Sequence, residues 1–258
     1  MTDRIDLMPD AKGFRRVSYT CRYGFVDWGH ALPGRPSDPN SLAGLHRQLT
    51  TEKGLWPGTE TTDLRLNGRP AFLVTYGMGM GKRVLGVKLG MSTMAHWVVQ
   101  RALSPRQREE VALGMLRLAT EQFETFQEKM GLSSGYSAED LPSNLLGLIS
   151  LFRGLPLPQL RSMLGEVNVK DSTEVWDRQL GKAGLGSVKN RDWNPRLFPC
   201  DACLRGDTTP PTLLSGARYA KQGGKWVRIA GRYIDGALVN AGLPLDVDGR
   251  GNVRVGRR

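Results

Sequence analysis

Cysteine and histidine are scarce in this chain, which has 258 residues but only three of each. Three cysteines cannot form the disulfide framework of a small secreted scaffold, and the length is enough to bury a substantial core instead. Cys200 and Cys203 have the Cys-x-x-Cys spacing of one of the two ligand pairs in a zinc ribbon. A structural zinc needs about four ligands, however, and the other candidates lie far upstream. These two thiols could pair with each other or both remain reduced.

Long apolar runs are also absent. No stretch approaches the roughly 18 apolar residues of a membrane helix, and residues 1–6 lack the apolar core of a signal peptide. We therefore expect no transmembrane segment. We expect a protein that is cytoplasmic as synthesised, with export to the periplasm or to a target cell only by a route that needs no signal peptide.

Acidic residues are outnumbered, because 25 Asp and Glu stand against 36 Lys and Arg, for a formal net charge of +11. Such a chain is attracted to polyanions, which include nucleic acid, anionic membranes and acidic cell-wall polymers. The basic residues are spread along the chain with only a modest concentration over 250–258, so a nucleic-acid arm is not evident. The expected partner is an anionic cell-wall polymer or peptide, followed by a secretion component or an immunity protein. Nucleic acid ranks below these.

Turn residues and alternating apolar residues predict a small antiparallel meander. The pair Asn67-Gly68 indicates a hairpin over 63–76, and a third strand is expected over 83–89. Residues 77–82, Gly-Met-Gly-Met-Gly-Lys, do not satisfy the phosphate-loop pattern. They are predicted to be a flexible loop between the strands.

Helices account for most of the remaining core, so the predicted fold class is α+β with a mainly helical core. The clearest helix covers 104–130, with Ser104 as its N-cap, Gln107 as capping-box partner and a periodic apolar stripe. Shorter helices are expected over 41–50, 91–103, 142–152, 158–166 and 172–183. Near 185–192 the composition changes to loops and short strands. The sequence thus predicts a mainly helical domain over 1–185 that contains the candidate site, and a loop- and β-rich C-terminal extension over 186–258.

Reactive side chains are concentrated in residues 19–30, which contain the thiol of Cys21, the carboxylate of Asp27 and the imidazole of His30. If the chain turns helical just after Cys21, the helix N-terminus favours a thiolate there. Asp27 and His30 would then be neighbours on one helix face.

A second polar group stands at the start of the apolar helix that follows Ser137. Its members are Glu139, Asp140, Ser143 and Asn144. They could satisfy the free groups of the helix end or face a ligand. Capping accounts for Asp140 but not for Asn144.

A thiol mechanism is the first of two that a cleft between these stretches would allow. Cys21 would attack a carbonyl, His30 would be the base, and Asp27, Glu139 or Asn144 would orient it. On one continuous helix Cys21 and His30 would lie about 13 Å apart along the axis, so the chain would have to bend between them.

A metal mechanism avoids that distance. A divalent ion holding a water molecule would be bound by Asp27 and His30 together with Glu121 or Glu124, and Glu139 or Asp140 could complete the site. One imidazole among carboxylates suits a harder metal than zinc.

Two segments carry a resemblance to a known family. Residues 19–30 read Tyr-Thr-Cys-Arg-Tyr-Gly-Phe-Val-Asp-Trp-Gly-His, and residues 137–147 read Ser-Ala-Glu-Asp-Leu-Pro-Ser-Asn-Leu-Leu-Gly. Together with the helix between them they resemble the bacterial domain of unknown function 4056 family, over residues 17–185. That family's helix tends to carry a His-Glu pair before an aromatic residue, whereas this chain has Glu121 and Glu124 without a histidine. The resemblance implies a mostly helical, envelope-associated protein.

These observations favour a hydrolase of the bacterial cell envelope, a metal- or thiol-dependent peptidase or amidase acting on peptide or amide bonds of peptidoglycan. A basic chain without a signal peptide fits a secreted antibacterial effector or toxin. One alternative is a non-catalytic envelope-binding or secretion-assembly protein, in which Cys21, Asp27 and His30 serve packing and salt bridges. The other is a nucleic-acid-binding protein.

Overall fold

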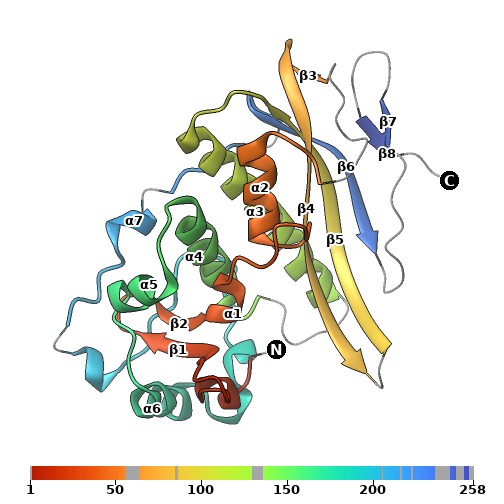
Figure 1. The fold of residues 1–258 in the computed structure, drawn as a ribbon. Helices are drawn as coiled ribbons and strands as arrows, with labels where there is room; N and C mark the ends of the chain where they lie inside the picture. The colour runs from red at the N-terminus through yellow and green to blue at the C-terminus, as the bar shows by residue number, and fades with distance from the viewer. Residues whose placement is uncertain are drawn as a thin grey trace. The chain divides into compact units, whose positions relative to one another are not determined.

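The chain folds into two compact units, each built from two segments (Figure 1). Unit 1 comprises Met1–Leu32 and Glu124–Ala217, and unit 2 comprises Pro33–Phe123 and Arg218–Arg258. The structure is a computed structural model that describes residues 2–55, 64–84, 87–129, 136–204, 206–215, 217–221, 223–235, 245–247 and 253–255. The predicted boundary at 185/186 lies inside unit 1, because Leu185, Cys200 and Cys203 share one apolar cluster with Tyr19 and Phe25.

Unit 1 is organised around a short antiparallel hairpin, in which Val17 lies opposite Asp27 and Thr20 opposite Gly24. Gly24 has φ +73°, and a side chain there would overlap the backbone carbonyl of Arg196, so the position requires glycine. The elements of unit 1 are η1 (Arg4–Leu7), β1 (Val17–Thr20), β2 (Gly24–Asp27), α1 (Trp28–Ala31), α4 (Asp140–Phe152), α5 (Leu157–Met163), α6 (Val169–Gln179), η2 (Gly181–Ala183), η3 (Leu185–Ser187), η4 (Asp201–Cys203) and α7 (Thr212–Ser215).

The hairpin separates two apolar clusters, because successive strand residues face opposite sides. Phe25 lies in one cluster, where its ring meets Tyr19 at 5.0 Å and Trp176 at 5.7 Å in edge-to-face geometry. Val26 lies in the other, with Trp28 and apolar residues of α4 and α5. Both faces of the hairpin are therefore buried, which fixes its register and the point where β2 turns into α1.

Unit 2 contains a four-stranded antiparallel sheet in the order β3-β4-β5-β6. Figure 1 shows β4 and β5 as its longest strands. The elements of unit 2 are α2 (Leu42–Thr51), β3 (Arg65–Leu66), β4 (Arg69–Val84), β5 (Val87–Gln100), β6 (Val227–Asp235), the small hairpin of β7 (Leu245–Val247) and β8 (Val253–Val255), and most of α3 (Pro105–Lys129), which ends in unit 1. The buried Gln48 of α2 exchanges two 2.8 Å hydrogen bonds with the backbone of Thr75 in β4.

The α+β prediction is confirmed, together with its strongest local signals. Asn67 and Gly68 form the turn between β3 and β4, and both have positive φ. Ser104 and Gln107 form the predicted capping box at the start of α3, since each backbone N–H donates to the other's side chain.

Three element predictions are wrong. The strand expected over 83–89 is instead divided between the end of β4 and the start of β5, since Arg83 pairs with Lys88 and Val84 with Val87. Residues 91–103 were expected to be a helix, yet β5 continues to Gln100, because this segment pairs with β4 on one side and β6 on the other. The loop expected over 77–82 is part of β4, whose pairing with β5 runs from Ala71 without interruption to Val84. Hydrogen bonds from neighbouring strands, β4 and β6 for 91–100 and β5 for 77–82, outweigh the local preference of a segment for helix or loop.

Among the helices that the structure describes, none is long and apolar enough to span a membrane.

Candidate functional site

The chain brings Asp27 to the junction between β2 and α1. It is the N-cap of α1, and its Oδ1 accepts a 2.8 Å hydrogen bond from the backbone N–H of Gly29. The predicted helix that would begin just after Cys21 does not form, since residues 21–23 are the turn of the hairpin. Asp27 and His30 therefore stand at the start and in the last turn of a single short helix.

Arg16 of unit 1 neutralises the buried carboxylate of Asp27. The guanidinium Nη2 lies 2.8 Å from Oδ2, and Asp27 is 0% exposed. Burial opposes the ionised form, but His30, Arg16 and the Gly29 N–H outweigh it and hold the pKa of Asp27 below its usual value. Asp27 is thus a fixed negative charge at neutral pH.

The first turn of α4 supplies the second polar group, all of it buried. The Ser143 hydroxyl accepts a 3.0 Å hydrogen bond from the backbone N–H of Asp27, which joins α4 to the end of β2. The Asp140 carboxylate accepts a 3.0 Å hydrogen bond from the backbone N–H of Ser137, while the N-cap of α4 is Glu139 and not the expected Ser137. Ser143 and Asp140 therefore have structural partners.

Glu139 and Asn144 contain buried polar atoms without hydrogen-bond partners among the described residues. Neither carboxylate oxygen of Glu139 is bonded, although the residue is only 1% exposed, and the side-chain nitrogen of Asn144 is also unbonded. The Thr2 hydroxyl lies near enough to Glu139 to lower its pKa, but its hydrogen bond, 3.4 Å long, goes to Asp27. Unbonded buried polar groups cost about 1–3 kcal/mol each, so proteins rarely keep them without a use.

Burial and neighbouring charges separate the pKa values of these carboxyl groups. Burial, reinforced by the charge of Asp27, raises the pKa of Glu139 to about 7. Burial and then the charges of Glu139, Glu124 and Asp27 raise the pKa of Asp140 well above its usual range. At neutral pH the cluster therefore contains an ionised Asp27 and a partly ionised Glu139, beside an Asp140 whose protonated form is favoured by burial and by the neighbouring charges.

His30 is the member of this cluster that reaches solvent, with 37% of its side chain exposed. Its Nδ1 is shielded and lies 3.5 Å from Oδ1 of Asp140, close enough for electrostatic contact but not aligned as a hydrogen bond. Burial, assisted by the positive charge of Arg16, lowers the pKa of His30 against the opposing effect of Asp27. The imidazole is therefore neutral at pH 7.

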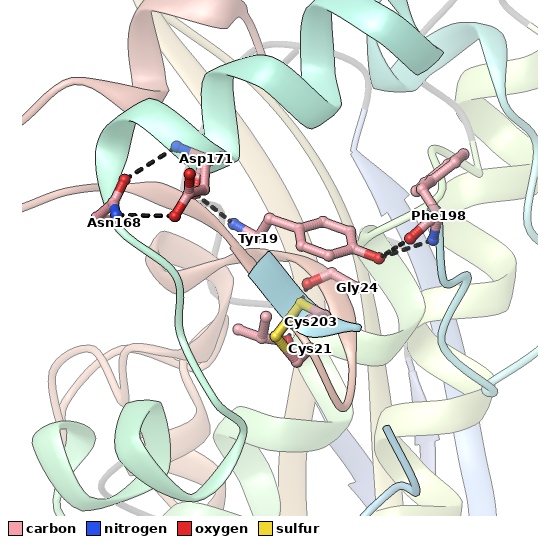
Figure 2. Close-up of a disulfide and its surroundings, with 9 residues drawn as sticks. Tyr19, Cys21, Gly24, Asn168, Asp171, Phe198 and Cys203 are labelled. Carbon is pink, nitrogen blue, oxygen red and sulfur yellow. Dashed lines mark hydrogen bonds between the residues drawn. A yellow bond between two sulfur atoms is a disulfide. The ribbon is translucent and has the colours of Figure 1, made fainter. Parts of the chain in front are cut away.

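Cys21 is not a free thiol, which overturns the thiol mechanism. It forms a disulfide with Cys203, 182 residues further along the chain (Figure 2). Figure 2 also shows the Tyr19 hydroxyl at the backbone of Phe198, where it accepts a 2.8 Å hydrogen bond from the N–H. The disulfide and Tyr19 both tie the hairpin to the segment after residue 185.

Cys200 is the one free cysteine of the three, and it is buried. The expectation that Cys200 and Cys203 would either pair or both be reduced is therefore wrong. Burial raises the pKa of the Cys200 thiol, which makes it a poor nucleophile. With Cys203 in a disulfide, a zinc ribbon cannot form here.

The predicted metal ligands are divided between the two units. Glu124 is buried in unit 1, where it accepts a 2.7 Å hydrogen bond from the backbone N–H of Tyr136. Glu121 belongs to unit 2 and pairs with Arg117 at 3.0 Å. Among the described residues no three His, Cys, Asp or Glu side chains are placed to hold a metal ion.

The sequence analysis did not identify two residues of the site, Thr2 and Arg16. Arg16 belongs to a pair of arginines just before β1, and the hairpin register that sets Val17 opposite Asp27 is what brings it to the carboxylate. A prediction of that register could have found it. No sequence signal marks Thr2.

Comparison with protein-family models, with curated proteins and with solved structures finds no match to this chain. The resemblance to the domain of unknown function 4056 family stays a prediction. What can be said of the site is therefore that four side chains from β2, α1 and α4, namely Asp27, His30, Glu139 and Asp140, form a buried cluster of carboxyl groups beside one imidazole.

Proposed function

We propose that this protein is a hydrolase that cleaves peptide or amide bonds of the bacterial cell envelope, and that the Glu139 cluster is its acid–base centre. The observation that carries the proposal is the carboxylate of Glu139, which is 1% exposed and accepts no hydrogen bond from the described residues. A general base needs a free lone pair and a pKa near the working pH, and Glu139 offers both with respect to the described part of the chain.

The proposed reaction uses the two neighbouring carboxyl groups in opposite protonation states. Glu139 takes a proton from water while the water oxygen bonds to the carbonyl carbon. The protonated Asp140 gives its proton to the leaving amine as the C–N bond breaks, and the proton held by Glu139 then restores Asp140. The unbonded side-chain nitrogen of Asn144 is a donor available to the developing oxyanion.

The other members of the cluster act by position. Asp27, fixed by Arg16 and the α1 cap, keeps a negative charge that raises the pKa of Glu139. The neutral His30 lies at the solvent side of the cluster, against Asp140. A divalent ion is not required by these steps.

The disulfide supports action outside the reducing cytoplasm. Disulfides persist in oxidising compartments such as the bacterial periplasm. The Cys21–Cys203 disulfide joins positions 182 residues apart, and cytoplasmic reductants would keep the two cysteines as free thiols. Together with the charge of +11, which attracts anionic wall polymers, it fits the proposed envelope substrate and an exported effector.

The test is hydrolysis of purified peptidoglycan, measured as the release of new amino groups. Glu139→Gln should lower the rate by about 10²–10⁴-fold, the usual contribution of a general base. The wild-type rate should rise with pH through about 7 as Glu139 ionises. Glu174→Gln, an exposed substitution on α6, is the matched control and should leave the rate unchanged. Wild-type activity in Glu139→Gln would contradict the proposal.

A non-catalytic envelope-binding or secretion-assembly protein is the second candidate. It is favoured by the structural partners of Asp27, Asp140 and Ser143, which explain these residues without chemistry. In that case the wild-type protein would bind peptidoglycan without releasing amines. Glu139→Gln would then leave binding unchanged.

A further inference from the structure

The excess positive charge of the chain belongs entirely to unit 2. Unit 1, which contains the Glu139 cluster, has 15 of the 36 Lys and Arg residues and 15 of the 25 Asp and Glu residues. Unit 2 has the other 21 basic residues and only the other 10 acidic ones, so it accounts for the whole formal charge of +11. A polyanion would therefore be attracted to unit 2 and not to the unit that contains the cluster.

Four basic residues of unit 2 surround one end of its sheet and form what we call the basic corner: Arg65, Arg69, Lys225 and Arg228. At this end Val99 of β5 pairs with Phe72 of β4 on one side and with Val227 of β6 on the other. The turn between β3 and β4 reaches the start of β6, because the side-chain nitrogen of Asn67 donates a 3.3 Å hydrogen bond to the carbonyl oxygen of Lys225. The four residues come from two distant segments of the sequence and lie at one end of the sheet.

Apolar packing under the corner keeps the basic side chains at the surface. Leu64 and Leu66 share a buried cluster with Val98 of β5, and Arg65 stands between them in the sequence. Since successive residues of an extended chain face opposite sides, Arg65 points away from this packing. Val98 also lies directly opposite Arg228 in the register of β5 and β6. All four residues of the basic corner are exposed.

None of the four basic side chains forms an ion pair with a residue that the structure describes. The ion pairs described within unit 2 belong to other arginines, namely Arg101, Arg106, Arg108 and Arg117. The two segments that form the corner, 64–70 and 223–228, contain no Asp or Glu. Four uncompensated charges at one place complement a ligand with several negative groups better than a single small anion.

We propose that the basic corner of unit 2 binds the repeated carboxylates of peptidoglycan stem peptides, and that unit 2 thereby holds the protein on the cell wall. The choice of this polymer rests on the proposed function, whereas the assignment of polyanion binding to unit 2 does not. The Cys21–Cys203 disulfide favours the wall over nucleic acid as the partner, since disulfides persist in oxidising compartments such as the periplasm and not in the cytoplasm.

The experiment is co-sedimentation of the full chain with purified peptidoglycan sacculi, performed with Glu139→Gln so that the sacculi stay intact. The corner variant, with Arg65→Gln, Arg69→Gln, Lys225→Gln and Arg228→Gln combined, should bind about 30-fold more weakly, which is two- to threefold for each exposed charge contact. Sacculi whose carboxylates have been amidated should bind the protein with its basic corner intact as weakly as native sacculi bind the corner variant. Salt at about 0.5 M should release the protein from native sacculi.

The matched control removes the same number of charges from unit 1. It combines four substitutions at exposed positions, Lys12→Gln, Lys170→Gln, Lys182→Gln and Arg196→Gln. This control should bind sacculi within about twofold of the parent protein, and urea unfolding should be alike in both variants. Equal losses in the two variants would mean that net charge alone drives binding. That result, undiminished binding to amidated sacculi, or no binding to native sacculi would each overturn the inference.

Two further measurements separate the partner and the proposed function. A DNA duplex of about 20 base pairs should bind more weakly than sacculi at the same salt concentration; tighter binding that the corner variant loses would make nucleic acid the partner and overturn the inference. With Glu139 restored, the corner substitutions should lower the rate of hydrolysis of intact sacculi relative to that of a soluble muropeptide, and an unchanged ratio would also overturn it. Corner-dependent binding to sacculi without any hydrolysis by the wild type would refute the proposed function alone.

Discussion

Replacing Glu139 by glutamine should make the protein more stable at pH 8 and leave its stability unchanged near pH 4. Glutamine has the size of a protonated glutamate but cannot ionise. The substitution therefore changes the charge that the buried side chain can carry and not its volume. The side chain is 1% exposed, and burial is the main cause that raises its pKa. The ionised form is therefore disfavoured in the folded state relative to the unfolded chain.

The magnitude follows from the difference between the two pKa values. Glu139 has a pKa of about 7 in the fold against 4.5 for the unperturbed side chain. The unfolded state loses its proton first, so the stabilising contribution is complete below pH 4.5 and is lost as the pH rises to 7. The loss amounts to about 3 kcal/mol, which Glu139→Gln should recover above pH 7.

The assay is urea unfolding followed by tryptophan fluorescence between pH 4 and 8, because Trp28 and Trp176 are buried in the same unit as Glu139. The free energy of unfolding of the variant should exceed that of the wild type increasingly from pH 4.5 upward. Glu174→Gln, which changes an exposed carboxylate, should follow the wild type at every pH. Parallel pH profiles for Glu139→Gln and the wild type would refute the burial argument.

Two other predictions concern the supports of the site. Cys21→Ser should lower the free energy of unfolding by about 5 kcal/mol, the chain-entropy value for a loop of this length, while Cys200→Ser should change it far less; peptide mapping without reductant should recover Cys21 joined to Cys203. Ser143→Ala should cost about 1–3 kcal/mol in urea unfolding because the buried N–H of Asp27 loses its acceptor; an unchanged midpoint would mean that the N–H finds another partner.

The buried carboxyl groups of Glu139 and Asp27 affect the stability of the fold at neutral pH in opposite ways. A carboxyl group held at a raised pKa destabilises the fold at neutral pH, and such costs are common where activity requires a group that the fold alone would not select. Asp27 is the opposite case, since Arg16 and the helix cap stabilise its charge. The pKa values of Asp27 and Glu139 are therefore shifted in opposite directions because the surroundings of the two carboxyl groups differ.

Local chemistry in the sequence was sufficient for the elements that depend on neighbours along the chain. The capping box of Ser104 and Gln107 and the positive φ at Asn67 and Gly68 involve residues only a few positions apart, so their signals survive in any context. The grouping of Glu139 with Asp140 and its neighbours at a helix start was predictable for the same reason.

Tertiary structure decided what depends on distant partners. Three cysteines allow three pairings, and only the packing of the β1–β2 turn against η4 selects Cys21 with Cys203. The local sequence of segment 91–103 does not predict a strand. It forms one because β4 and β6 hydrogen-bond to its two edges. The protonation of Glu139 likewise follows from burial and from the charge of Asp27, a residue 112 positions away. The sequence determined which groups could react, and the fold determined which of them are left free to do so.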